Sequence, residues 1–284
     1  MKLPFQSYDF KQYKPLKYLS DTGKCLVNNR FIYKYLSLSS LYQTFENGLR
    51  FVFPAEWTDH GERRFVQADY EAVNKDFVAP HFFATCFTTN KQSEASWKGY
   101  VNFDAIHKSI EHNKSIDTDL FTVVQVKINR TALRSQLAKY CKAQGCTIYE
   151  GKVCYVPSFA FLNCHLPDKP GSISLHKDLF ERDSFGLDDY LSACLMKRKE
   201  VFEHEKEIRY ILINDCEKSC CHVKLDMAQI VEQISVMKLI SRETVSKEDC
   251  EQIARRLSID CQRVNAADIY MRESEQPLNI ARRP

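Results

Sequence analysis

The chain has 284 residues, of which 44% are hydrophobic and 27% charged, and its formal net charge is +3. This composition is ordinary for a globular protein and excludes wholesale disorder. The small net charge does not indicate a strongly basic surface of the kind that binds nucleic acid, so a nucleic acid could bind only at a local basic patch. No apolar run approaches the ~18 residues of a membrane span, and the N-terminus lacks a secretory core, so we expect a cytoplasmic protein without membrane contact.

Twelve cysteines are present, and they lie in apolar stretches as often as in loops. The tight cluster among them comprises Cys216, Cys220, Cys221 and His222. A structural zinc site usually needs a second pair of ligands, which here requires Cys250 and Cys261 to converge on the first. Without an export signal, free thiols are the favoured interpretation, and we expect no metal and no disulfide.

The first clear elements follow residue 30. Residues 31–35 are rich in aromatic and β-branched side chains and predict a strand. Ser37 and Ser39 are candidate N-caps of a helix that ends at Gly48. Alternating apolar residues then predict a strand over 49–53, which Pro54 ends.

The rest of the chain alternates strands and helices. Strands are predicted at 82–88, 121–128, 208–213, 234–240 and 259–264. Helices are predicted at 68–78, 130–141, 188–203 and 246–257. Asn129 and Ser246 are the expected N-caps, the latter with Asp249 in a capping-box pattern. Residues 147–156 form either a strand or a hairpin turning at Glu150 and Gly151.

No stretch has the composition of a linker between domains, and no repeat is present. We therefore expect an N-terminal arm (1–30), a single α+β domain (31–265) and a C-terminal tail (266–284). Five of the strands should pair in one bent, mixed or antiparallel sheet flanked by helices. They are 31–35, 49–53, 82–88, 121–128 and 208–213.

The loop after the second strand could carry chemistry. It places Trp57, Asp59, His60 and Glu62 together, and loops on a rigid scaffold often hold functional residues. The alternative is a solvated turn in which Asp59 bonds nearby backbone amides. A second candidate site pairs Thr88 with Trp97, both of which follow a buried strand. The Thr88 hydroxyl could fix a substrate and the Trp97 ring could stack on it. Alternatively, Thr88 simply ends the strand and Trp97 packs in the core.

A third group of charges runs into the strand at 208–213. If residues 205–209 are extended, Glu205, Glu207 and Arg209 share one face. Two carboxylates beside a guanidinium suit a ribose or a developing cation, whereas the alternative is a helix end with solvated charges. We expect all three groups around one cleft, with Arg209 pairing with Asp59 or Glu62 so that Glu207 stays free for a ligand.

These groups occur in an order that resembles the bacterial family catalogued as domain of unknown function twenty-nine seventy-one. The matching stretches are Tyr33-Lys34-Tyr35, Asn47-Gly48, the segment from Pro54 to Glu62, Cys86-Phe87-Thr88 with Ser96-Trp97, and Lys199, Phe202, Glu205, Glu207 and Arg209. Thr58 and His60 depart from the asparagine and proline usual in the family. The resemblance spans roughly residues 31–260.

A looser resemblance is to ADP-ribosyltransferases. It implies an NAD-consuming transferase or glycohydrolase with an ADP-ribosyltransferase-like fold, acting as a toxin or defence effector. The catalytic residues would be Tyr33, Thr88, Glu205 and Glu207. The ligand-binding residues would be Lys34, Asp59, Glu62, Trp97 and Arg209. NAD would be the substrate, because a carboxylate beside the ribose stabilises the cation that forms as nicotinamide leaves.

The sequence leaves a second class open, a non-catalytic module that binds a nucleotide or a partner protein. It does not identify the acceptor of an ADP-ribosyl group, which could be a protein, a nucleic acid or water. A pocket joining Tyr33, Thr88 and Glu207 would favour the enzyme, because fold-level resemblance alone does not establish function.

Overall fold

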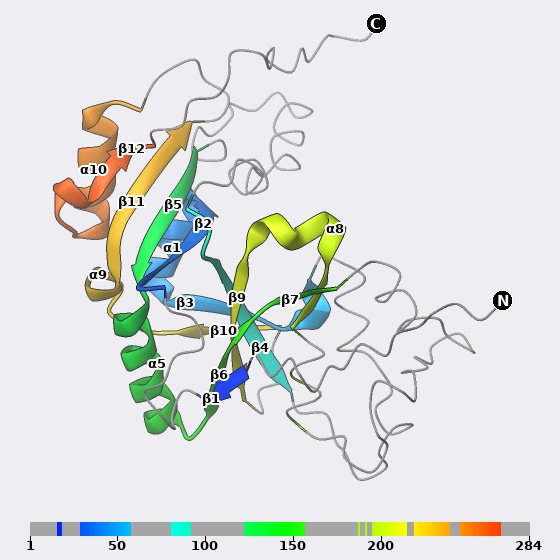
Figure 1. Cartoon of the computed structure of the whole chain (residues 1–284). Coiled ribbons are helices and arrows are strands. Elements are labelled where there is room, and N and C mark those ends of the chain that lie inside the picture. Colours follow the sequence, from blue (N-terminus) through cyan, green and yellow to red (C-terminus); the bar gives the residue numbers. More distant parts are fainter. Residues whose placement is uncertain are drawn as a thin grey trace, which may run out of the picture.

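The computed structural model describes residues 16–18, 29–57, 81–91, 122–156, 187, 191, 195–214, 219–238 and 245–267. Ten strands in these ranges form one sheet (Figure 1). Eight follow the order β1 (Leu16–Tyr18), β6 (Thr147–Lys152), β9 (Glu207–Ile213), β4 (Phe82–Thr88), β2 (Phe31–Ser37), β5 (Thr122–Asn129), β11 (Val231–Lys238) and β12 (Val264–Ala266). β3 (Leu49–Val52) joins the side of β4 and pairs with β10 (Cys220–Val223).

Among the described residues, neighbouring strands of this sheet are antiparallel except β11 and β12, which are parallel. The prediction of an α+β fold with a mixed, mainly antiparallel sheet is therefore confirmed. The strands predicted at 31–35, 49–53, 82–88, 121–128 and 208–213 all belong to this sheet, within one or two residues of their observed ends.

The sheet divides between β2 and β4. β4 pairs with β9 and β2 pairs with β5 along their full lengths, whereas β2 and β4 meet only at Tyr33 and Thr88. Figure 1 shows the two halves running in different directions from this junction. Strand twist accumulates across a sheet, and a single-pair junction lets the halves diverge.

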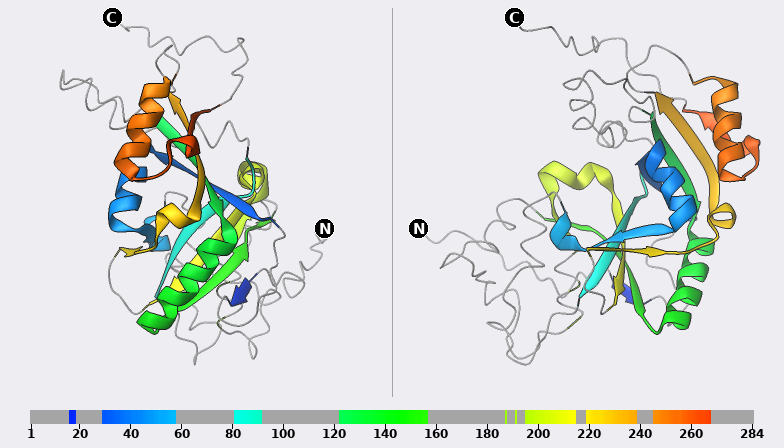
Figure 2. Two further views of the ribbon diagram at one scale, coloured as in Figure 1. Left: turned by 90° about the vertical axis from the view of Figure 1, so that its left-hand side faces the viewer. Right: turned by 180° about the vertical axis from the view of Figure 1, so that it is seen from behind.

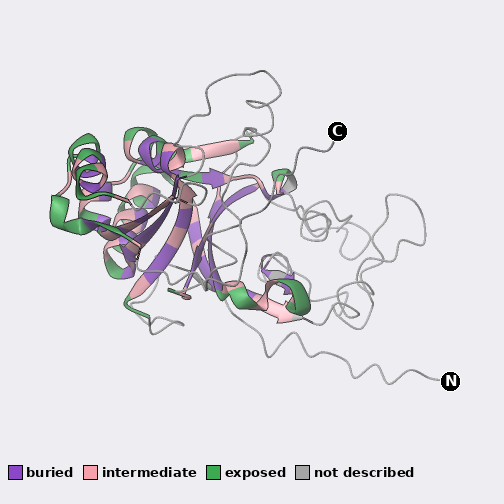
Figure 3. Cartoon of the chain, turned by 90° about the horizontal axis from the view of Figure 1, so that it is seen from above, coloured by how far each residue is buried: buried purple, intermediate pink, exposed green. Residues whose placement is uncertain are grey.

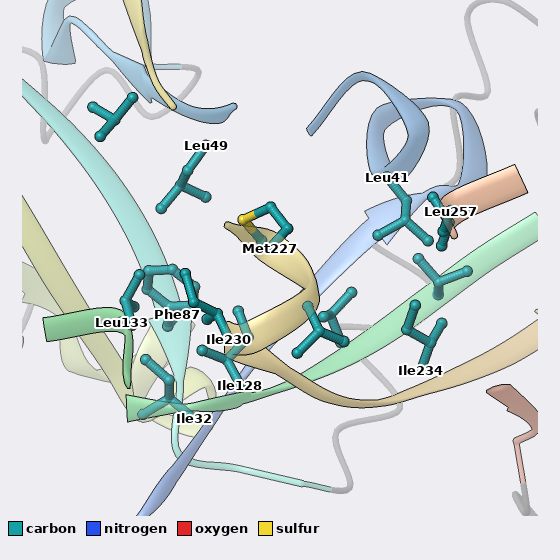
Figure 4. Close-up of a cluster of buried hydrophobic side chains, with 14 of the residues drawn as sticks. Ile32, Leu41, Leu49, Phe87, Ile128, Leu133, Met227, Ile230, Ile234 and Leu257 are labelled. Carbon is teal, nitrogen blue, oxygen red and sulfur yellow. The ribbon is translucent and has the colours of Figure 1, made fainter. Parts of the chain in front are cut away.

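Four helices pack against one face of the sheet. They are α1 (Leu38–Asn47), α5 (Arg130–Gln144), α9 (Met227–Ile230) and α10 (Lys247–Leu257). Leu41, Leu133, Ile230 and Leu257 from these helices join one hydrophobic cluster with strand residues such as Ile32 (Figure 4). In the left view of Figure 2 these helices face the viewer, and their outer surfaces are exposed in Figure 3. The opposite face of the sheet holds a smaller apolar cluster around Tyr35 and Val123.

The predicted helix ends are confirmed at several positions. The Ser37 side chain accepts from Ser40 N and begins α1, and Asn129 accepts from Ala132 N at the start of α5. Ser246 and Asp249 form a reciprocal capping box on α10. Each cap satisfies backbone donors that the first helical turn leaves unpaired.

Gly48 ends α1 with a φ of 103°, and a Cβ built there would lie 2.5 Å from the Val223 carbonyl oxygen. Gly145 ends α5 with a φ of 66°, and a Cβ there would meet nothing within 4 Å. We expect Gly48→Ala to lower the free energy of unfolding clearly more than Gly145→Ala, whose cost should be about 1 kcal/mol. Urea denaturation of the two variants measures the difference, and equal losses would contradict the close approach of β10.

Of the two alternatives for residues 147–156, the strand is confirmed, because residues 147–152 continue as β6 through Glu150 and Gly151 without a hairpin turn. Other sequence predictions were wrong. The helix predicted at 188–203 is interrupted: Leu191 is helical, residues 196–198 form strand β8, and residues 199–202 form helix α8, while 188–190 and 192–194 lie outside the described residues. The strand expected at 259–264 is shorter and later, because residues 261–263 form a 3₁₀ turn before β12. The helix predicted at 68–78 lies outside the described residues.

A second, two-stranded parallel sheet pairs β7 (Cys154–Val156) with β8 (Met196–Arg198). Helix α8 (Lys199–Phe202) follows β8, and a 3₁₀ turn over Glu203–Glu205 leads into β9. Cys154 N donates to Leu195 O at 3.0 Å, and Val153 N donates to Glu207 O at 3.0 Å. This ribbon is therefore tied to the start of β9, a position that becomes important for the site.

Of the predicted arm, Leu16–Tyr18 pairs with β6 at the edge of the sheet. Eight cysteines lie among the described residues as free thiols, at 86, 141, 146, 154, 220, 221, 250 and 261. Within the described ranges, no helix combines the length and the apolar character that crossing a membrane demands.

Candidate functional site

Strand β9 alternates charged and apolar side chains, and the two sets face opposite sides of the sheet. Ile208 and Tyr210 join the main hydrophobic cluster, so Glu207 and Arg209 lie on the other side, which we call the Glu207 face. Both residues are buried, with 4% and 1% of their surfaces exposed. Charges at this depth need partners, because an unpaired charge in the interior is costly.

Glu207 is bound by two cations. Arg209 Nε donates to Glu207 Oε1 at 2.6 Å, and Arg209 Nη2 donates to Oε2 at 3.3 Å. Lys197 Nζ donates to Oε2 at 2.8 Å. Burial alone would raise the pKa of Glu207, but the charges of Arg209 and Lys197, with hydrogen bonds from Arg209 and Cys86, hold this pKa well below its ordinary value. Glu207 is therefore ionised at neutral pH.

Lys197 also binds the second carboxylate of the site. Its Nζ donates to Glu205 Oε2 at 2.6 Å, and it lies 4.5 Å from the centre of the Phe202 ring. The Glu205 side chain is 31% exposed, against 5% for that of Glu207. The site thus contains one buried carboxylate and one that reaches solvent, joined by a single ammonium group.

The ribbon β7–β8 supplies two of the groups around Glu207. Tyr155 on β7 and Lys197 on β8 are direct register partners. The Tyr155 hydroxyl oxygen accepts from Glu207 N at 2.7 Å, while Lys197 binds the Glu207 carboxylate. Burial raises the pKa of Tyr155, so it acts as a neutral phenol here. Both the backbone and the side chain of Glu207 are therefore fixed by this ribbon.

The end of β4 fixes the turn that carries Glu205. The Thr88 hydroxyl donates to Glu205 O, and Thr89 N donates to Lys206 O at 3.1 Å. Asn90 Nδ2 donates to His204 O at 3.2 Å. Lys206 has a φ of 46°, which ends the 3₁₀ turn and redirects the chain into β9. The left-handed conformation at Lys206 is therefore supported by bonds from three consecutive residues of the neighbouring strand end.

Trp57 covers Arg209. The guanidinium carbon lies 4.2 Å from the centre of the indole ring, close enough for a cation–π interaction. Trp57 follows a 3₁₀ turn over Pro54–Glu56, and its own N–H donates to Pro54 O at 3.0 Å. Arg209 is consequently enclosed between an aromatic face and the Glu207 carboxylate.

Tyr33, Thr88 and Glu207 form a row across three adjacent strands. Tyr33 is the register partner of Thr88, and Thr88 is the register partner of Glu207. Register partners present their side chains on the same face, so all three belong to the Glu207 face. Tyr33 is 9% exposed, and burial raises the pKa of its phenol. The row crosses the junction at which the two halves of the sheet diverge.

Lys34 lies on the opposite face. Its Nζ donates to Thr85 Oγ1 at 3.1 Å and to Cys86 O at 2.8 Å, and it lies 4.9 Å from the centre of the Phe87 ring. Burial lowers the pKa of Lys34, although Cys86 and Glu207 oppose this shift. Its ammonium group satisfies a β4 carbonyl near the point where β2 turns away, which is a structural role at the junction.

A separate buried ion cluster occupies the helix-packed face. Glu150 Oε1 accepts from Arg130 Nε and from the Tyr210 hydroxyl, both at 2.6 Å. Arg134 Nε lies 3.6 Å from Glu150 Oε2. Burial, followed by the charge of Glu150, raises the pKa of Tyr210 well above its ordinary value. This cluster ties α5 to the central strands on the face of β9 opposite the Glu207 network.

The structure brings together five of the predicted site residues on the Glu207 face. They are Tyr33, Thr88, Glu205, Glu207 and Arg209. Glu205 reaches it from a 3₁₀ turn and not, as predicted, from an extended strand. Asp59, Glu62 and Trp97 lie outside the described residues, so their place at the site stays a prediction.

The expected state of Glu207 was wrong. We predicted that Glu207 would stay free for a ligand, but it binds both Arg209 and Lys197. The predicted pairing of Arg209 with Asp59 or Glu62 stays a prediction, because both acids lie outside the described residues. The physical reason is proximity, because Glu207 and Arg209 are two positions apart on one strand and share a face. A nearby guanidinium satisfies a buried carboxylate without closing a long loop.

Sequence reasoning missed three groups at the site. Lys197 lies in a segment that was predicted to be helical, and the sequence gave no sign that it faces inward. Tyr155 and Cys86 come from apolar strands, and neither residue type marks such a position by itself.

No family model, no curated protein and no solved structure matches this chain. Among the described residues, no group of three or more His, Cys, Asp or Glu side chains is placed to hold a metal ion. Cys216, one member of the considered zinc cluster, lies outside these residues.

Proposed function

We propose that this protein consumes NAD⁺ at the Glu207 face, as an ADP-ribosyltransferase or an NAD glycohydrolase. The observation that carries the proposal is the row of Tyr33, Thr88 and Glu207 across three neighbouring strands at the sheet junction. The residues that the resemblance to ADP-ribosyltransferases selected from distant segments share one face, which a chance pattern match would not require.

Glu207 has the charge state that the reaction needs. When the bond between nicotinamide and ribose breaks, its electron pair leaves with nicotinamide and the ribose becomes an oxocarbenium-like cation. An ionised carboxylate already in place stabilises that cation without reorganisation. The pKa of Glu207, lowered by Arg209 and Lys197 against the effect of burial, keeps this carboxylate charged throughout the physiological range.

The other residues take supporting roles in this proposal. Glu205, which is more exposed, would accept the proton that the attacking acceptor loses when its oxygen or nitrogen bonds to the ribose carbon. Tyr33 would offer its ring to nicotinamide or adenine. Arg209, fixed by Trp57 and Glu207, would hold the carboxylate and is not itself the reacting group.

One observation favours the alternative of a non-catalytic nucleotide-binding or protein-binding module. Glu207 already makes ionic contacts with two cations, so its charge is balanced before any ligand arrives. In that case the protein would bind NAD⁺ or ADP-ribose at the same face and release nothing.

Incubation with NAD⁺ tests both functions in one experiment. Nicotinamide release, followed by chromatography, supports the enzyme, and a mass increase on co-purified macromolecules identifies a transferase as opposed to a glycohydrolase. Calorimetric titration with NAD⁺ and ADP-ribose is run beside it. Binding without release supports the module, and neither binding nor release overturns the assignment of NAD⁺ to this protein.

A further inference from the structure

We infer that Lys197 is a positioning residue of the Glu207 site, holding the Glu205 and Glu207 carboxylates side by side in their working arrangement. The inference rests on the proposed function for the meaning of that arrangement, but its physical content can be measured without turnover. Nothing in the sequence patterns assigned a role to Lys197.

The geometry around the Lys197 ammonium carries the inference. Nζ lies 2.6 Å from Glu205 Oε2 and 2.8 Å from Glu207 Oε2, so one cation bridges two carboxylates from different secondary-structure elements. The Lys197 side chain is 10% exposed. The Phe202 ring, with its centre 4.5 Å from Nζ, covers it. An ammonium group with three donors suits this bridging position, since each carboxylate takes one donor.

The position of Lys197 is imposed by its surroundings. Its register partner Tyr155 accepts from Glu207 N at 2.7 Å, and Val153 N donates to Glu207 O at 3.0 Å. The backbone of Glu207 is thereby bound to the segment that pairs with β8. These backbone contacts hold the ribbon that carries Lys197 against the start of β9, which places its ammonium beside the Glu207 carboxylate.

Removing this ammonium has an electrostatic consequence. The two carboxylates would lose the cation between them, and like charges at short range oppose ionisation. The charged and titratable groups that face Glu207 from the elements around it are Arg209 on β9, Lys197 on β8, Tyr155 on β7, Cys86 on β4 and Glu205 in the 3₁₀ turn. Lys34 on β2 lies on the opposite face of the sheet and acts on Glu207 only through its charge. Arg209 would remain, so Glu207 should still ionise, but with a higher pKa than in the natural protein.

The test compares two substitutions of Lys197 with a control at Lys247. Lys197→Met removes the charge, Lys197→Arg keeps it, and Lys247→Met removes a lysine whose side chain is 92% exposed and pairs with Glu251 on its own helix. Carbon-13 NMR of labelled glutamate carboxyls follows the titration, and the Glu207 signal is assigned by its loss in Glu207→Gln. The pH profile of nicotinamide release is recorded on the same samples.

We expect Lys197→Met to raise the pKa of Glu207 by about 1–3 units, the usual effect of losing an opposite charge at this range. The pH below which nicotinamide release slows should rise by the same amount. Lys197→Arg should titrate close to the natural protein, as should Lys247→Met. If Lys197→Met does not fold, Lys197→Gln, which keeps a hydrogen-bond donor without the charge, provides the same measurement.

An unchanged Glu207 titration in the neutral variants would overturn the role of Lys197. A shifted titration without nicotinamide release from any variant, the natural protein included, would support the positioning role and refute the proposed enzyme. The two failures are therefore distinguishable, because the NMR signal does not depend on turnover.

Discussion

Arg209→Met is expected to lower the free energy of unfolding by about 3–5 kcal/mol, the usual cost of removing one partner from a buried ion pair. The substitution leaves Glu207 buried with Lys197 as its remaining cation and empties the guanidinium position under Trp57. Chemical denaturation measures the loss. Arg255→Met is the matched control, since Arg255 is exposed and bonds only to the Glu251 carbonyl oxygen of its own helix.

The loss should depend on pH in a defined direction. The folded-state pKa of Glu207 lies below its unfolded value, so Glu207 contributes stability that is fully present above the unfolded value and lost as pH falls toward the folded one. Without Arg209 the pKa of Glu207 in the folded protein rises toward its unfolded value. The part of the free energy of unfolding that acid removes by protonating Glu207 is then smaller. The difference between the natural protein and Arg209→Met should therefore shrink as pH falls below about 4. A loss under about 1 kcal/mol at neutral pH would show that Arg209 is not the main partner of Glu207.

Glu150→Ala is expected to be comparably damaging, at about 3–5 kcal/mol. It removes the acceptor of Arg130 Nε and of the Tyr210 hydroxyl, two buried donors that would be left with one partner fewer. Glu150→Gln keeps an acceptor oxygen and should lose less. Glu232→Ala, which removes an exposed bond to Asn129 Nδ2, is the control and should stay within about 1 kcal/mol.

The two buried clusters make different predictions for function. The Glu150 cluster lies on the helix-packed face, and the Glu207 network lies on the other side of β9. Variants of Glu150 should reduce stability while the folded fraction keeps its full rate. A change in rate per folded molecule in Glu150→Gln would mean that the two faces are coupled through the strand.

Local sequence patterns predicted the local structure well. Ser37, Asn129 and Ser246 mark helix starts because their side chains accept from backbone amides in the first turn. Apolar and β-branched runs predicted the central strands because those strands are buried on both faces, as β4 shows, in which every residue except the half-buried Cys86 is buried. These patterns involve residues that are close in sequence, so a single sequence is enough to predict the elements they mark.

The candidate site depends on contacts between distant residues, and here prediction was partial. The Glu207–Arg209 contact could have been derived from their spacing on a strand. Lys197 could not, because its orientation is set by pairing with Tyr155 in a ribbon that the helix prediction concealed. Glu205 lies on the predicted face, but it is held there by a 3₁₀ turn that Thr88 and Asn90 bind, and not by the extended strand that was predicted.

The rate of nicotinamide release from NAD⁺ by Glu207→Gln, compared with Glu150→Gln at equal folded fractions, tests the central claim most directly. Both substitutions replace a buried carboxylate that binds an arginine of the same chain, so both should cost stability, and only one changes the Glu207 face. We predict that Glu150→Gln keeps the natural rate and that Glu207→Gln loses at least about 10²–10³-fold, the usual effect of removing a preorganised electrostatic group. Equal rates in the two variants would contradict the assignment of Glu207 as the catalytic carboxylate.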